Sequence, residues 1–170
     1  MKILVVVDMQ NDFIDGALGS SEAVAIVPYV KALIENFDGK VFFTRDTHFE
    51  NYLDTQEGKK LPVMHCIKGS YGWQISEELD RLRVTEPVDK LTFGSRELAE
   101  VISNENNVEE VVFVGLCTDI CVISNVMTLK AFCPEIPIKV DARGCAGVTI
   151  ESHNTALAAM KMCQVEIVGE

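Results

Sequence analysis

The chain has 170 residues, and its 26 acidic against 15 basic side chains give a formal net charge of −11. This length suits one domain, and we expect residues 1–170 to form it. The negative charge argues against nucleic acid as a partner, and no apolar run approaches the roughly 20 residues that a membrane span needs.

The first predicted element is a strand over Ile3–Val7. Asp8 and Asp12 end this apolar run, so the N-terminal segment predicts a strand and not a signal peptide. We therefore expect a cytoplasmic protein. The six cysteines form no C-x-x-C pair, and in that compartment we expect them to be reduced thiols.

A loop rich in glycine and serine, residues 16–21, precedes a helix that we expect to begin near Pro28. Val30, Leu33, Ile34 and Phe37 have the spacing of a core-facing stripe on that helix. Lys40–Arg45 is the second predicted strand. Residues 46–73 show little periodicity and read as one long excursion, which inside a compact domain is usually functional.

Strands and helices continue to alternate in the second half of the chain. We expect strands over Arg83–Lys90 (weaker, interrupted by Pro87), Val111–Val114, Ile136–Val140 and Val165–Val168, and helices over Ser95–Ile102, Ile120–Phe132 and Thr149–Met162. This alternation predicts an α/β fold: a single-domain, doubly wound, Rossmann-like, mainly parallel sheet with helices on both faces.

Residues capable of chemistry stand where the predicted strands end. Asp8 follows the first strand, Asp46 and His48 follow the second, Lys90 ends the weak third, and Cys121 lies just beyond the fourth. Each of them could be an ordinary turn former, cap or solvent-exposed side chain. Ligands of an open parallel sheet bind at the carboxyl ends of its strands, so this common placement predicts a functional site there.

Cys121 is the predicted nucleophile. Gly115 breaks the preceding strand and Thr118-Asp119 indicate a helix start, which puts the thiol in the first helical turn. Because the positive end of the helix dipole favours a thiolate, we expect a lowered pKa for Cys121. The alternatives are a small buried apolar residue, or a redox pair formed with Cys117.

Asp46 and His48 lie two residues apart on one side of an extended segment, and His65 supplies a second imidazole within the same excursion. Glu57 and Asp54 are carboxylates between them. Two histidines and two carboxylates suit one divalent ion, with zinc the first choice and manganese or iron as alternatives. Such side chains could equally be caps and hydrogen-bonding residues of a loop.

Three segments resemble the signature blocks of the isochorismatase-like cysteine hydrolases, in the family's order and across nearly the whole chain. They are Asp8-Met9-Gln10-Asn11-Asp12-Phe13, Lys90-Leu91-Thr92-Phe93-Gly94-Ser95 and Gly115-Leu116-Cys117-Thr118-Asp119-Ile120-Cys121-Val122. The resemblance implies a catalytic triad of Asp8, Lys90 and Cys121. It also implies a cis peptide between Leu116 and Cys117, with the N–H groups of Cys117 and Cys121 forming an oxyanion hole.

Within that family, residues 44–48, 57–58 and 61–65 look like the metal segment of the nicotinamidases. Matching residue by residue suggests Asp46, His48, Glu57 and His65 as ligands. Many nicotinamidases carry a third histidine where this chain offers Asp54 or Glu57, so the resemblance leaves the third ligand open. Isochorismatases proper generally lack the metal set, which favours an amidase.

The function that the resemblance implies is hydrolysis of nicotinamide to nicotinic acid and ammonia through a cysteine thioester. The alternative substrate is another small amide, such as a carbamoyl or ureido compound, and a third hypothesis is a non-enzymatic metal or thiol redox module. Phe13, by resemblance, and Trp73, by its loop position, are candidates to sandwich a flat ring, although either could simply be core packing. We expect a small-molecule amide as partner, no membrane or nucleic acid, and a homo-oligomer.

Overall fold

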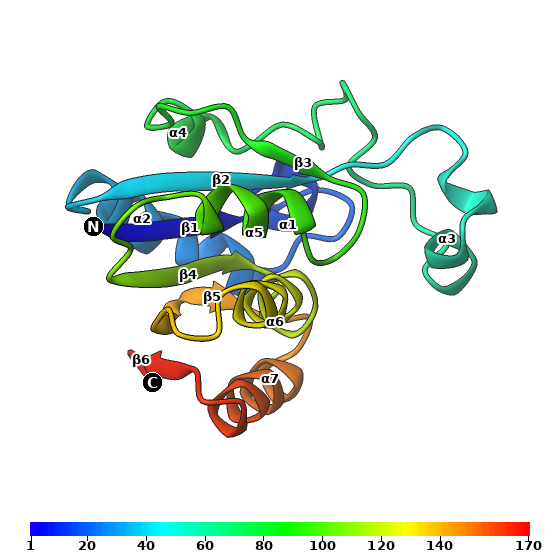
Figure 1. Cartoon of the computed structure of the whole chain (residues 1–170). Helices are drawn as coiled ribbons and strands as arrows, with labels where there is room; N and C mark the ends of the chain where they lie inside the picture. The colour runs from blue at the N-terminus through cyan, green and yellow to red at the C-terminus, as the bar shows by residue number, and fades with distance from the viewer.

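Six parallel strands form one sheet in the computed structural model, which describes residues 1–170 (Figure 1). Their spatial order is β3-β2-β1-β4-β5-β6. The strands are β1 (Lys2–Val7), β2 (Lys40–Asp46), β3 (Val88–Lys90), β4 (Glu110–Leu116), β5 (Ile138–Ala146) and β6 (Glu166–Val168). This order confirms the predicted doubly wound α/β fold, with the direction of winding reversing between β1 and β4.

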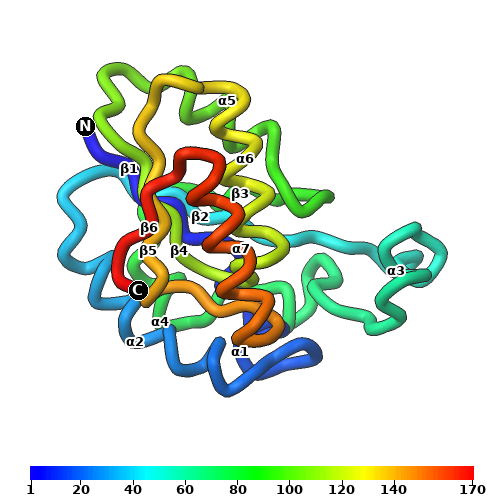
Figure 2. The backbone as a smooth tube through the Cα atoms, turned by 90° about the horizontal axis from the view of Figure 1, so that it is seen from below, coloured from blue at the N-terminus to red at the C-terminus, as the bar shows by residue number.

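Helices cover both faces of this sheet (Figures 1 and 2). The helical elements are α1 (Asn11–Ile14), α2 (Ser21–Glu35), η1 (Tyr52–Asp54), α3 (Gln56–Lys60), α4 (Glu77–Asp80), α5 (Arg96–Ser103), η2 (Thr118–Val122), α6 (Ile123–Phe132) and α7 (Ile150–Met162). α1, α2 and α4 lie on one side, and α5, α6 and α7 on the other (Figure 2). Because both faces are covered, the residues Ile3–Val7 of β1 are wholly buried, as their unbroken apolar run predicts.

The helix expected to begin near Pro28 begins at Ser21, so that prediction is wrong by two turns. Ser20 caps the helix by accepting a hydrogen bond from the Ala23 N–H at 3.0 Å. Pro28 lies inside α2 on its exposed side, where water can replace the hydrogen bond that proline cannot donate. A strong cap outweighs an interior proline in this helix.

The lengths of two strands also differ from the prediction. β3 is reduced to Val88–Lys90 because Pro87 cannot donate to a strand ladder and the preceding residues turn. β5 extends to Ala146 although Asp141, Arg143 and Gly144 resemble turn residues. The buried Asp141 accepts hydrogen bonds from Tyr29 and Arg143, so a polar residue is tolerated within the strand.

The long excursion after β2 contains two short helices, η1 and α3, and α3 projects away from the sheet in both views (Figures 1 and 2). The helices predicted over Ser95–Ile102 and Thr149–Met162 are present as α5 and α7, and Ser95 and Thr149 cap them by each accepting a backbone hydrogen bond from the first turn. None of the helices is both long and apolar enough to cross a membrane.

Candidate active site

Three strand ends bring Asp8, Lys90 and Cys121 into contact. Asp8 follows β1, Lys90 is the last residue of β3, and Cys121 lies in the turn η2 that follows β4. The Lys90 ammonium lies 2.5 Å from Asp8 Oδ2 and 3.4 Å from Cys121 Sγ, and all three side chains are buried. A thiol, a cation and a carboxylate in contact can carry out acyl transfer without a histidine.

The pKa expected for Cys121 is wrong in direction. Burial raises the pKa of this thiol well above its ordinary value, while the Lys90 ammonium lowers it and the Asp8 carboxylate raises it further. Burial likewise raises the pKa of Asp8, against the opposing effect of Lys90. The sequence shows the helical turn, but the desolvation of Cys121 comes from segments distant along the chain.

The turn that carries Cys121 differs from a regular helix start. Residues Thr118–Val122 form a π-helical turn before α6, and the peptide between Leu116 and Cys117 is cis, as the resemblance implies. The Val122 N–H donates to the Cys117 carbonyl, while the Cys117 N–H has no acceptor within the chain. Cys117 and Cys121 both line the same cavity.

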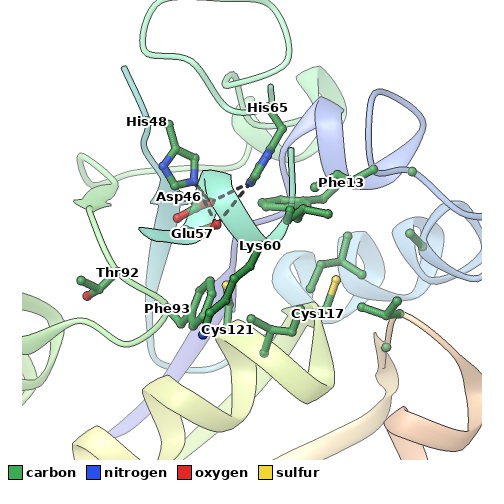
Figure 3. Close-up of a pocket in the computed structure, with 18 of the residues that line it drawn as sticks. Phe13, Asp46, His48, Glu57, Lys60, His65, Thr92, Phe93, Cys117 and Cys121 are labelled. Carbon is green, nitrogen blue, oxygen red and sulfur yellow. Dashed lines mark hydrogen bonds and ion pairs between the residues drawn. The ribbon is translucent and has the colours of Figure 1, made fainter. Parts of the chain in front are cut away.

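Asp46, His48, Glu57 and His65 converge beside this triad, and one potential ligand atom from each lies within 4.8 Å of all the others (Figure 3). His48 Nε2 is 2.9 Å from Asp46 Oδ2 and 3.5 Å from Glu57 Oε1. His65 Nε2 is 3.7 and 3.8 Å from the same two oxygens. Asp54 is exposed and outside the cluster, so Glu57 is the carboxylate that the structure brings together with the histidines.

This donor set fits a divalent ion. A tetrahedral zinc site requires ligand atoms roughly 3.3 Å apart, close to the observed separations. His65 Nδ1 lies 2.8 Å from the Val63 carbonyl, so a proton on that nitrogen leaves Nε2 free to coordinate. Burial alone would raise the pKa of Asp46, but the hydrogen bond with His48, the nearby His65 imidazole and the charge of Lys90 outweigh it and hold that pKa well below its usual range. The carboxylate is therefore ionised, as a ligand must be.

A cavity of about 910 Å³ joins the two groups, because Cys121, Asp46, His48, Glu57 and His65 all line it (Figure 3). Its remaining walls are largely apolar. They include Phe13, Leu18, Ala23, Leu61, Leu91, Phe93, Ile120 and Val148. A pocket of this size and character accepts a small organic molecule.

Of the two aromatic residues predicted to bind a ring, Phe13 lines the cavity with its ring centroid 5.6 Å from that of His65. Trp73 does not line it, so its predicted role is corrected. The indole N–H donates to Thr47 Oγ1 at 2.9 Å, and the Arg45 guanidinium stacks on the ring at 3.7 Å. Trp73 thus packs against the end of β2.

Several residues at the site were not predicted. Thr44 donates to Asp8 Oδ1 at 2.6 Å, and Phe93 and Lys60 line the cavity. Phe93 stands in a predicted signature block, which could have signalled its position, whereas an exposed lysine in an irregular excursion gives no signal. His153 of α7, which lies outside the cavity lining, is half-buried with Nδ1 2.7 Å from Thr118 Oγ1.

Comparison with known proteins agrees with this geometry. The family model of the isochorismatase domain matches residues 2–169. A nicotinamidase/pyrazinamidase of Mycobacterium tuberculosis is 26% identical over 99% of this chain and 98% of its own length. The crystal structure of Pyrococcus horikoshii pyrazinamidase in complex with zinc superposes with a TM-score of 0.80, at 26% identity and 99% coverage of both chains.

A further structural neighbour has a different substrate in its name. The N-carbamoylsarcosine amidase of Thermoplasma acidophilum superposes with a TM-score of 0.79, at 25% identity over 98% of this chain and 94% of that one. Fold, site and family model lead to one conclusion: the chain belongs to the isochorismatase family, as a nicotinamidase-like hydrolase of amide bonds.

Proposed function

We propose that residues 1–170 form one isochorismatase-like hydrolase domain that converts nicotinamide and water to nicotinic acid and ammonia, with Cys121 as nucleophile. The observation that carries this proposal is the shared cavity: a cysteine–lysine–aspartate triad and a cluster of two histidines and two carboxylates line or adjoin the same space. A generic cysteine amidase needs only the triad. The second cluster supports a substrate whose ring nitrogen is recognised apart from its amide.

Asp8 is the proton acceptor and donor in this proposal. Its Oδ2 has no hydrogen bond of good geometry. The pKa of Asp8 is raised in the direction of neutral pH, as suits a general base. Asp8 takes the thiol proton as Cys121 Sγ attacks the amide carbon. The same proton then passes to the leaving nitrogen, the C–N bond breaks, and ammonia departs from a thioester.

Water completes the reaction. Asp8 accepts a proton from a water molecule as the water oxygen attacks the thioester carbon. The C–S bond breaks, nicotinic acid is released, and the proton passes from Asp8 to the Cys121 sulfur, which restores the thiol. In both steps the N–H groups of Cys117 and Cys121 receive the oxyanion, and one such donor is typically worth about 3 kcal/mol. The unpaired Cys117 N–H supports this role. Lys90 stays charged, because its pKa is raised by Asp8 despite burial, and it balances the negative charge.

Asp46, His48, Glu57 and His65 would hold the divalent ion, for which zinc is the first choice. Once bound, the ion would supply a Lewis acid for a ring nitrogen or a water molecule beside the nucleophile. Phe13 supports the ring from the cavity wall.

The decisive test is ammonia release from nicotinamide and benzamide, by enzyme with and without zinc. We expect nicotinamide to be the better substrate by at least tenfold, and removal of metal to abolish this preference, because orientation of the amide is lost. Equal rates on both amides would contradict the nicotinamidase assignment. A carbamoyl compound such as N-carbamoylsarcosine belongs in the same panel, since the likeness to an amidase of that compound supports it as a second candidate.

Cys121→Ala should abolish ammonia release and leave the protein folded, because it removes one sulfur from a cavity wall. Cys145→Ala is a matched control, since Cys145 is also a buried free thiol but lies outside the cavity lining. We expect the control to retain activity in the same assay. Substantial turnover by Cys121→Ala would show that another group is the nucleophile.

A further inference from the structure

Two polar side chains of the loop after β1 remain unexplained by the catalytic proposal. The segment Asp8–Phe13 carries the base Asp8 and the ring contact Phe13, but it also carries Gln10 and Asp12. Gln10 is completely buried, and it does not line the cavity. A buried amide that cannot reach a substrate requires partners within the protein.

The side-chain amide of Gln10 makes hydrogen bonds to both backbone polar groups of Asp46, one of the candidate metal ligands. Its Oε1 accepts the Asp46 N–H at 2.7 Å, and its Nε2 donates to the Asp46 carbonyl at 2.9 Å and to the Trp73 carbonyl at 2.8 Å. Both N–H donors of the amide are thereby used. Among uncharged side chains only an amide offers a donor and an acceptor spaced to pair with one residue's N–H and C=O.

This contact replaces a missing strand. The pairing of β1 with β2 ends at Val6 and Phe43, so Asp46 at the end of β2 has no strand neighbour on that side. The Gln10 amide supplies the hydrogen bonds that such a neighbour would make. Asp46 needs this fixed position because its Oδ1 is 3.3 Å from the Lys90 ammonium while its Oδ2 faces His48 at 2.9 Å.

Asp12 likewise fixes the backbone of the segment that carries the candidate ligand His65. Its Oδ2 accepts the N–H of Cys66 at 2.7 Å, directly after His65. Cys66 has φ of 47°, a conformation that non-glycine residues rarely adopt and that requires such support. Gly72 allows the close approach, because a Cβ there would lie 2.0 Å from Asp12 Oδ2.

We propose that Gln10 and Asp12 are positioning residues that fix the two ligand-bearing segments, at Asp46 and at His65–Cys66, to the loop that carries the base Asp8. This inference rests on the proposed metal site. The loop after β1 thereby sets both the position of the proton acceptor and the spacing of the ligand cluster, so a change in this loop alters metal binding without altering any ligand.

The test measures zinc affinity by competition with a chromophoric chelator, well below the unfolding temperature of every variant. Gln10→Met keeps the size of the side chain and removes its hydrogen bonds, and loss of such outer contacts weakens metal binding roughly 10- to 100-fold. Asn11→Leu is the matched control: Asn11 is the next residue, is also buried, and donates to the Tyr71 carbonyl, which adjoins no ligand. We expect its zinc affinity to stay within about twofold of the unsubstituted protein.

Asp12→Ala should weaken zinc binding in the same direction, and Asp12→Asn, which keeps an oxygen for the Cys66 N–H, should restore most of the affinity. If Gln10→Met does not fold, Gln10→Glu serves in its place, since it keeps one acceptor and loses both donors. Unchanged affinity in a folded Gln10 variant, or equal losses in Gln10→Met and Asn11→Leu, would overturn the inference while the metal site stands. Failure of the unsubstituted protein to bind zinc would overturn the proposed metal function as well.

Discussion

The reactivity of Cys121 depends on a balance of three neighbouring effects. Burial raises the pKa of the thiol, the carboxylates of Asp8 and Asp46 raise it further, and the Lys90 ammonium opposes them. In the mechanism proposed above, the site at rest therefore holds a thiol beside a base, and the thiolate forms as Asp8 takes the proton. Among these neighbours, the Lys90 ammonium is the group that favours the thiolate.

Removal of this cation gives a prediction with a definite sign. In Lys90→Met the pKa of Cys121 should rise further, so the rate of alkylation of Cys121 by iodoacetamide should reach its midpoint at higher pH. The rate is followed by mass spectrometry of the peptide that contains Cys121. Lys59→Met, at an exposed lysine outside the cavity lining, should leave the profile unchanged. A shift to lower pH in Lys90→Met would show that the cation does not act on the thiol.

At the scale of single elements, the short helix α3 determines which carboxylate joins the histidines. Thr55 caps it by accepting the Gly58 N–H at 3.0 Å, and the cap orients the first turn so that Glu57 faces the cavity. Tyr52 of η1 packs against both histidines, with its ring centroid 4.6 Å from that of His48 and 5.0 Å from that of His65. η1 and α3 therefore act as one support for the ligand cluster.

Gly58 makes the contact between these two elements possible. A Cβ there would lie 2.1 Å from the Tyr52 carbonyl oxygen, so Gly58→Ala must displace α3 from η1. Alanine is otherwise favoured over glycine within a helix by about 1 kcal/mol, which makes any loss attributable to the displacement. We expect at least tenfold weaker zinc binding in a titration. Lys59→Ala in the same helix is the control, and a Gly58→Ala variant that binds zinc equally well would contradict this account of α3.

For the whole molecule, the ligand cluster joins separate stretches of the chain: Asp46 ends β2, His48 follows it, Glu57 belongs to α3, and His65 lies in the loop beyond α3. An ion that binds only when they are together must stabilise the folded state. The stabilisation amounts to about 2.7 kcal/mol at a free metal concentration 100 times the dissociation constant.

Thermal unfolding should therefore respond to zinc. The Tm should rise progressively with added zinc and fall when a chelator is added, as monitored by circular dichroism. In His48→Ala and His65→Ala the rise should disappear, because each variant removes one imidazole from the cluster. A rise of equal size in these variants would indicate that zinc binds elsewhere, for instance on the acidic surface of this chain of net charge −11.

The alternation of strands and helices and the strand-end placement of Asp8, Asp46, Lys90 and Cys121 could be predicted from the sequence, whereas the order of the strands in the sheet comes from the structure. Apolar runs that alternate with helical periodicity are a local signal, and parallel strands necessarily end at one edge of the sheet. The limits of α2 and β5 could not be predicted in the same way. A cap, a proline or a buried aspartate has an effect that depends on what packs against it.

By itself the sequence determined the fold class, because alternating strand and helix periodicity is a local signal. It also indicated the metal-binding candidates by their spacing, and its resemblance to the isochorismatase-like hydrolases implied the residues of the triad. Only the tertiary structure showed that Glu57, and not Asp54, joins the two histidines, that Trp73 lies outside the cavity lining, and that burial raises the pKa of Cys121. The physical reason is common to all three outcomes. Orientation and desolvation are sums over contacts between distant segments, and no local pattern of residues contains them.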